Sequence, residues 1–127
     1  MTKKLEIYKC SVCGNVVQVL LPGMEALVCC GEKMQHLAIQ NSNDERTEIH
    51  SPLLTKTKNG EIEVSVKKHP MERNHFINFI ETISEDQNEV RIKYFIPCGE
   101  AVLNVPDTKK PFTARSYCNI HGVYQNK

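Results

Sequence analysis

The sequence has no concentration of charge of one sign and no long apolar run. Its 127 residues include 16 Lys and Arg against 15 Asp and Glu, so the formal net charge is only +1. No stretch gathers Lys and Arg as a nucleic-acid binder would, so we expect no nucleic-acid partner. No apolar run follows residues 1–6, and none elsewhere is long enough to span a membrane. We therefore expect a cytoplasmic protein with no signal peptide and no membrane segment.

Internal repeats and low-complexity tracts are also lacking. The length suits one average domain or two small ones. Apolar residues make up 40% and charged residues 24%, which is ordinary for a globular protein.

Cysteine, by contrast, is abundant for a reducing compartment. Thiols stay reduced there, so grouped cysteines usually indicate metal or redox chemistry and not disulfides. Two of the six, Cys98 and Cys118, stand apart. The other four fall within the first thirty residues: Cys10, Cys13, Cys29 and Cys30.

The chain changes character near residue 38. Before it lie short β-prone pieces at 5–9, 16–21 and 26–28, separated by glycine and proline turns. So short a segment cannot bury enough apolar surface to fold alone, and a metal staple is expected. The polar stretch 40–46 reads as a linker or surface loop. We therefore predict two domains, 1–38 and 39–127.

The second domain is predicted to be all-β. Ile62, Val64 and Val66 alternate with polar residues, and Asn59-Gly60 before them predicts a hairpin with 53–58. Further strands are expected at 90–96, 101–105 and 112–117. Segment 75–83 is apolar on both faces and fits a buried strand or a short helix, with its Ile and Phe content favouring the strand. Several short strands separated by turns indicate a sandwich or barrel.

The four N-terminal cysteines have metal-ligand spacing. A Cys-x-x-Cys turn brings two thiolates onto one metal, and Gly14 after it suits the positive φ of such a turn. Two more thiolates complete a tetrahedral sulfur site for zinc or iron. The adjacent pair Cys29-Cys30 can serve one metal only if the backbone bends. A plain zinc ribbon is the alternative; a redox dithiol fits less well, because four cysteines cluster instead of two.

Four of the five histidines form a second candidate site, together with one cysteine. They lie in loop-like or strand-end positions beside proline or glycine, and Cys118-x-x-His121 adds a thiol. One such histidine is usually just an exposed side chain, but this combination indicates a metal site. Its members are His50, His69, His75, Cys118 and His121.

These motifs resemble those of the desulfoferrodoxins, the two-iron class of superoxide reductases, over nearly the whole chain. The Cys-x-x-Cys-Gly and Cys-Cys motifs are similar to the family's desulforedoxin-like domain. The segments Glu48-x-His50-x-Pro52, His69-Pro-Met-Glu-x-x-His75 and Tyr117-Cys-Asn-Ile-His-Gly122 are similar to its catalytic-domain signatures. The resemblance implies a desulforedoxin-like metal knuckle followed by an immunoglobulin-like β-sandwich, and a homodimer.

The resemblance also implies the ligands of two irons. The first, ferric when oxidised, would be held by Cys10, Cys13, Cys29 and Cys30. The second, ferrous when active, would have His50, His69, His75 and His121 in a plane and Cys118 on the axis. One position stays open, where superoxide accepts an electron and becomes hydrogen peroxide. Rubredoxin or a similar carrier would supply the electron, and Glu48 resembles the glutamate that occupies the open position in the resting ferric enzyme.

One residue departs from the family pattern. The family usually has Glu-Lys-His where residues 48–50 read Glu-Ile-His. The lysine is thought to attract the superoxide anion, so Ile49 puts the rate and the protonation route in doubt. Lys68, next to His69, could compensate. We assign His36 to a surface or interdomain position, Cys98 to a free thiol in a turn and Tyr117 to the core.

Two other classes of function stay open on the sequence. The chain could be an iron electron-transfer or storage protein that does not turn over superoxide, or a zinc-stapled interaction module. Iron content separates them, because a ferric tetrathiolate site absorbs visible light and a zinc site does not.

Overall fold

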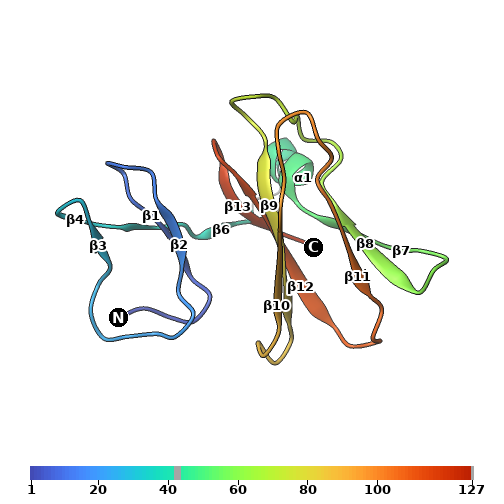
Figure 1. Cartoon of the computed structure of the whole chain (residues 1–127), viewed down its shortest axis with the longest axis horizontal. Coiled ribbons are helices and arrows are strands. Elements are labelled where there is room, and N and C mark those ends of the chain that lie inside the picture. Colours follow the sequence, from blue (N-terminus) through green and yellow to red (C-terminus); the bar gives the residue numbers. More distant parts are fainter. Residues whose placement is uncertain (42–43, 127) are drawn as a thin grey trace. The chain divides into compact units, whose positions relative to one another are not determined.

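Short β-strands predominate along the whole chain (Figure 1). The structure is a computed structural model that describes residues 1–41 and 44–126. The chain divides into two compact units, Met1–Ala38 and Ile39–Lys127. No helix in the described part of the chain has the length and apolar character needed to cross a membrane.

The N-terminal unit is built from five short strands. A three-stranded sheet has the order β2-β1-β5, with β1 (Ile7–Lys9) antiparallel to both β2 (Val16–Gln18) and β5 (Gln35–His36). A separate hairpin pairs β3 (Val28–Cys29) with β4 (Glu32–Lys33). The expected strands at 5–9, 16–21 and 26–28 are present in part, but they are shorter. Leu5 has a positive φ of 71°, and Leu20 and Leu21 are exposed.

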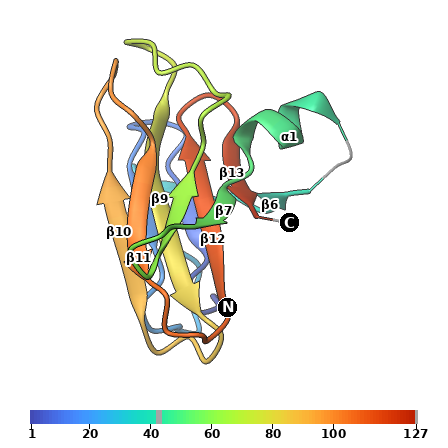
Figure 2. The ribbon, with the colours of Figure 1, turned by 90° about the vertical axis from the view of Figure 1, so that its right-hand side faces the viewer.

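The second unit is a two-layer β-sandwich (Figure 2). One layer has the strand order β10-β9-β12-β13-β6 and the other β11-β8-β7. The strands of the larger sheet are β6 (Ile39–Gln40), β9 (Ile77–Ser84), β10 (Val90–Tyr94), β12 (Phe112–Cys118) and β13 (Gly122–Gln125). Those of the smaller sheet are β7 (Leu53–Lys56), β8 (Glu61–Ser65) and β11 (Val102–Pro106). The all-β sandwich expected from the sequence is confirmed.

The sandwich core joins side chains from both layers. Val64 and Val105 of the smaller sheet pack in one cluster with Ile77, Ile80 and Ala114 of the larger. Burial of these apolar side chains stabilises the fold by about 1.5–3 kcal/mol for each fully buried Val or Ile. Cys118 belongs to this same cluster, so the core reaches one of the predicted metal ligands.

Two local predictions are confirmed by the pairing of the strands. β7 and β8 form the predicted antiparallel hairpin, and Gly60 in its turn has the positive φ of 74° that glycine accepts readily. Segment 75–83 forms strand β9 and not a helix. It lies between β10 and β12; its Ile77 and Ile80 pack in the sandwich core, and Phe79 stacks on Tyr117 of the same sheet.

The expectation of a loop over 40–46 is wrong at both ends of that stretch. Ile39–Gln40 forms β6, which pairs in parallel with β13, and Glu45 begins helix α1 (Glu45–His50). Residues 42 and 43 lie outside the described residues. One of the polar residues in this stretch caps the helix: the Asp44 carboxylate accepts the Thr47 N–H at 2.9 Å. His50 therefore ends a helix and does not sit in a loop.

Candidate metal centres

The four N-terminal cysteines converge on one point. Cys10 follows β1, Cys13 lies in the next turn, and Cys29 and Cys30 lie at the β3–β4 hairpin. Their four sulfur atoms all lie within 4.8 Å of one another. The Cys13 and Cys29 Sγ atoms are 3.6 Å apart, and those of Cys29 and Cys30 are 3.9 Å apart. The group could hold one metal ion.

The backbone around these sulfurs has the bends that the sequence demanded. The Cys13 N–H points at Cys10 Sγ at 3.4 Å, and Gly14 after it has a φ of 85°. Cys30 itself adopts a φ of 54°, in the left-handed region that non-glycine residues rarely enter. That turn lets the neighbouring Cys29 and Cys30 side chains meet on one side of the chain.

The electrostatics of the four thiols favour a cation among them. Hydrogen bonds from backbone N–H groups, above all that of Cys13, lower the pKa of Cys10 to about 6. The thiols of Cys13, Cys29 and Cys10 raise the pKa of Cys30 to about 12, and neighbouring thiols also raise that of Cys29. Four thiolates cannot accumulate here unaided, because each repels the next. A bound metal ion removes this conflict, so the residues fit the group.

The second group brings together donors from three separate segments of the sandwich unit: α1, the β8–β9 connection, and the end of β12 with its turn. His50 ends α1, His69 follows β8, His75 precedes β9, Cys118 ends β12, and His121 lies in the β12–β13 turn. One ligand atom from each of these five residues lies within 4.8 Å of all the others.

The four imidazole rings form a closed cycle. Each ring is in edge contact with two neighbours, and the four centroid distances fall between 4.4 and 5.0 Å. Going round the cycle, the order is His50, His69, His75 and His121.

Hydrogen bonds to backbone carbonyls set which nitrogen two of the rings offer. His50 Nδ1 lies 2.6 Å from the Arg46 carbonyl oxygen, and His69 Nδ1 lies 2.6 Å from that of Pro70. A carbonyl only accepts, so Nδ1 carries the proton and Nε2 keeps its lone pair. The Nε2 atoms of His50, His69 and His75 are buried with no hydrogen-bond partner in the described part of the chain. Three unpartnered buried nitrogens facing one point are what a metal ion would satisfy.

Burial favours the neutral form of three of these rings. It lowers the pKa of His69 to about 4 and is also the main cause of the lowered pKa of His50 and of His121. Only a neutral imidazole coordinates a metal, so these shifts favour metal binding.

Cys118 lies at an irregularity in the pairing of β12 with β9. Tyr117 pairs with Phe79 and Cys118 with Ile77, so β9 has one extra residue at this point. Cys118 is fully buried, and its sulfur lies 3.7 Å from His121 Nδ1. His121 therefore faces the site with Nδ1, whereas the other three histidines face it with Nε2.

Residues that the sequence analysis missed hold the site in place. The Tyr124 ring stacks on His50 with a centroid distance of 4.4 Å, and its hydroxyl donates to Gln40 Oε1 at 3.2 Å. The Gln40 amide in turn donates to the His121 carbonyl. Ser116 Oγ donates to the His50 carbonyl at 2.6 Å and secures the end of α1. No local pattern marks these residues, because each acts across a long stretch of chain.

A hollow of about 350 Å³ opens above the histidines. Its walls are Glu45, Arg46, Ile49, His50, His69, Pro70, His75 and His121. Residues 45, 46, 49 and 50 come from one face of α1, since positions three and four apart share a helix face. Glu48 is not among them. It is exposed, and its carboxylate pairs with Lys68 Nζ at 3.2 Å.

Models of two protein families match the chain. The model described as "Desulfoferrodoxin, N-terminal domain" matches residues 2–37, and the one described as "Desulfoferrodoxin" matches residues 42–127. The chain belongs to the desulfoferrodoxin family. With this membership, the four-cysteine group and the four-histidine, one-cysteine group are two iron centres.

Desulfoferrodoxins resemble the chain along its full length. That of Syntrophotalea carbinolica is 39% identical over 128 residues, covering 100% of this chain and 99% of its own. That of Nitratidesulfovibrio vulgaris is 40% identical over 131 residues, with 98% of both chains covered. The crystal structure of the superoxide reductase from Treponema pallidum matches with a TM-score of 0.71, at 19% identity and 100% coverage of both chains. The last match shows a shared fold.

Three further residues of this desulfoferrodoxin-family chain lie outside both iron centres. His36 is exposed and faces Glu6, with His36 Nε2 3.3 Å from Glu6 Oε2. Cys98 is an exposed free thiol in a turn, with a φ of 67°. Tyr117 is buried and stacks on Phe79 at a centroid distance of 5.4 Å.

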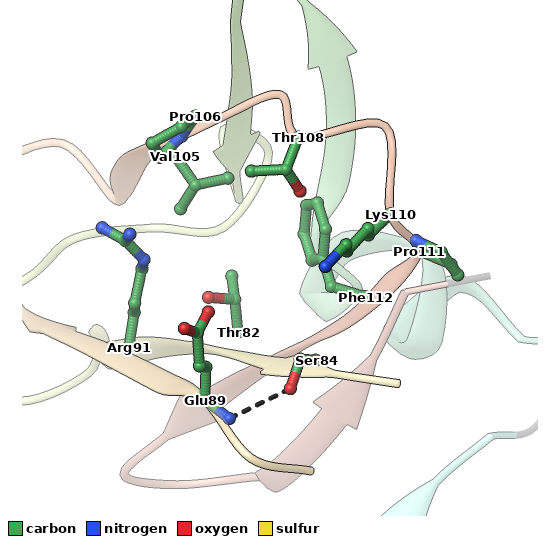
Figure 3. A pocket seen from close by; sticks show the side chains of 10 residues that line it. All are labelled: Thr82, Ser84, Glu89, Arg91, Val105, Pro106, Thr108, Lys110, Pro111 and Phe112. Atoms are coloured by element: carbon green, nitrogen blue, oxygen red, sulfur yellow. Dashed lines mark hydrogen bonds between the residues drawn. The ribbon is translucent and has the colours of Figure 1, made fainter. Parts of the chain in front are cut away.

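A second hollow of about 100 Å³ lies at the other end of the sandwich, between the β9–β10 and β11–β12 connections (Figure 3). The labelled residues include no cysteine or histidine. Its charged side chains are Glu89, Arg91 and Lys110, and the Glu89 N–H donates to Ser84 Oγ at 3.0 Å. This hollow is separate from both iron centres.

Proposed function

We propose that this chain is a superoxide reductase. Superoxide would take one electron and two protons at the four-histidine, one-cysteine centre and leave as hydrogen peroxide, with no oxygen formed. The observation that carries the proposal is the set of three unpartnered buried Nε2 atoms, gathered with a fourth histidine and a buried thiol beneath an open hollow.

His50, His69, His75, His121 and Cys118 would hold the iron. The chemistry that iron supplies when bound there is one-electron exchange between its ferrous and ferric states. Five protein donors would leave a six-coordinate ion able to take one further ligand from solvent. Four of these five donors are neutral imidazoles, so among the donors only Cys118 brings a negative charge.

Cys118 would adjust the electron-donating power of the centre. A thiol binds metal as a thiolate, and this one lies in the apolar core where water does not screen its charge. A thiolate ligand raises electron density at the metal and favours passing an electron to a bound acceptor. Burial also protects the sulfur from the peroxide product.

The hollow would admit superoxide and release peroxide. Ile49 and Pro70 line it with apolar surface, and all four histidines of the cluster also line it. The role of Glu48 as an occasional sixth ligand stays a prediction. In this structure its carboxylate is engaged with Lys68 outside the hollow, so that role requires α1 to move or the pair to break.

Relatives support the proposal at the level of family and fold. The Treponema pallidum protein that shares the fold is described as a superoxide reductase. Rubredoxin or a similar small carrier would supply the electron, the chain would act as a homodimer, and a reducing cytoplasm would suit its free cysteines.

The stoichiometry of the products tests the proposal. Superoxide is added in less than the molar amount of ferrous iron in the iron-loaded, reduced protein, and hydrogen peroxide and dioxygen are measured together. A reductase yields one peroxide per superoxide at the expense of its ferrous iron and releases no dioxygen. Dioxygen release with half as much peroxide would indicate a dismutase, and no superoxide consumption would indicate an electron-transfer or storage protein. A colourless zinc-loaded protein would favour an interaction module.

A further inference from the structure

Arg46 is a cationic side chain at the hollow over the histidine cluster. It lines the same hollow as His50, His69, His75 and His121. In the described part of the chain no carboxylate lies within ion-pair distance of its guanidinium. An arginine keeps its charge at every relevant pH, so Arg46 places a permanent positive charge at the hollow.

Helix α1 is what brings Arg46 to this position. Arg46, Ile49 and His50 are spaced by three and four residues, so they share one face of the helix. The Arg46 carbonyl also holds His50 Nδ1 at 2.6 Å, which ties the backbone of Arg46 to a ring of the cluster.

The other cation considered for this role, Lys68, is placed differently. Its ammonium is paired with Glu48 at 3.2 Å, and it does not line the hollow. A lysine–glutamate pair has no net charge, so its field falls off quickly with distance. Ile49 lines the hollow and brings no charge. Glu45 also lines it, and its negative charge opposes that of Arg46.

We propose that Arg46 is the specificity-determining residue that draws a small anion into the hollow. It supplies the positive charge that position 49, an isoleucine in this chain, does not. This inference rests on the proposed function in naming superoxide as that anion. Arg46 acts through its charge alone, before any electron moves. Its backbone hydrogen bond to His50 is independent of the side chain and survives substitution.

Two measurements on the iron-loaded protein test the role of Arg46. The first is the superoxide encounter rate by pulse radiolysis at low and high ionic strength. The second is the dissociation constant of azide for the oxidised protein, read from the visible spectrum. Arg46→Ala is expected to slow the encounter by about tenfold at low salt, with the difference shrinking as salt rises. It should weaken azide binding by about the same factor, and Arg46→Lys should keep most of both.

A matched control removes the same charge far from the site. Lys110 lines the hollow at the opposite end of the sandwich (Figure 3), so Lys110→Ala changes net charge equally and should alter neither measurement. The double variant Arg46→Ala/Ile49→Lys returns a cation to the same helix face and should recover the rate and its salt dependence.

The results separate this inference from the proposed function. Equal rates, salt slopes and azide affinities in the wild type and in Arg46→Ala would overturn the role of Arg46 while leaving superoxide reduction intact. A wild-type protein that consumes no superoxide would overturn the proposed function. Even then, the azide titration decides whether Arg46 attracts anions to the hollow.

Discussion

At the scale of single residues, Cys118 makes the sharpest functional prediction. We expect Cys118→Ser to lower the rate of superoxide reduction by more than about 100-fold, or about 2.7 kcal/mol of activation free energy. A serine hydroxyl stays protonated and donates little electron density to a metal. The rate is measured by pulse radiolysis and normalised to the iron bound in the sandwich unit. Near-normal turnover per bound iron would remove the thiolate from the mechanism.

A second prediction concerns the buried ion pair between Arg115 and Glu81. These residues face each other across β12 and β9, and Arg115 Nε donates to Glu81 Oε1 at 2.9 Å. Glu81 is fully buried, and its Oε2 has no hydrogen-bond partner in the described residues. Arg115→Met is expected to cost about 3–5 kcal/mol of unfolding free energy, because it leaves a buried carboxylate without its partner.

The matched variant for this pair replaces both residues. Glu81→Met/Arg115→Met removes the charges together and should recover most of the lost stability, since the Coulomb attraction and the desolvation cost disappear at once. Urea unfolding of the wild type and both variants gives the comparison. A double variant as unstable as Arg115→Met would show that packing, and not the unpaired charge, causes the loss.

At the scale of elements, one side chain ties two metal-binding segments together. Asn119, in the β12–β13 turn between Cys118 and His121, accepts the Phe76 N–H at 3.1 Å through Oδ1. Its amide also donates to the Asn74 carbonyl at 2.9 Å. His75 lies between these two contacts, so Asn119 holds the backbone on both sides of that ring.

We expect Asn119→Ala to weaken iron binding at the histidine site by about 10- to 100-fold, the usual loss when a group that orients a metal ligand is removed. Competition with a chelator, followed by iron analysis, measures the affinity. The four-cysteine centre serves as an internal control, because its visible spectrum should not change. Asn119→Asp keeps the acceptor and loses the donor, so it should fall between the wild type and Asn119→Ala. If Asn119→Ala retained iron at the histidine site as well as the wild type does, His75 would need no such support.

At the scale of the whole molecule, the donor groups of the two iron centres lie in separate compact units. All four cysteines of the first lie within Met1–Ala38, and all five ligands of the second lie within Ile39–Lys127. Each donor set is complete within its own unit. Loss of one iron therefore need not disturb the other.

We expect Cys13→Ser to remove the first iron and its colour, while the rate of superoxide reduction stays within about twofold of the wild-type rate. A twofold change is well under the tenfold change that about 1.4 kcal/mol of activation free energy would produce. The measurement combines iron content, the visible spectrum and pulse radiolysis of the pre-reduced protein. Complete loss of activity with iron still bound in the sandwich unit would mean that electrons must pass through the first centre.

Much of the fold was predictable because the strands carry local signals. The alternation over Glu61–Ser65 and the Asn59-Gly60 turn are short-range patterns, and both elements formed as expected. Helix α1 was missed because it has only six residues and begins in a polar stretch, so its cap resembled a loop. β6 was missed because its two residues pair with β13, some eighty residues away.

The sequence by itself determined which donor atoms the chain possesses and how neighbouring donors are spaced. Cys10 and Cys13, or Cys118 and His121, share one turn. The backbone bend at Gly14 goes with the Cys10–Cys13 spacing, and that at Cys30 with the adjacency of Cys29 and Cys30. Only the tertiary structure decided which four imidazole rings meet and which charge lines the hollow. Those depend on contacts between α1, the β8–β9 connection and the β12–β13 turn, and on the face that α1 presents. Spacing constrains only a few neighbouring residues, whereas contacts between distant segments arise when the two layers of the sandwich pack.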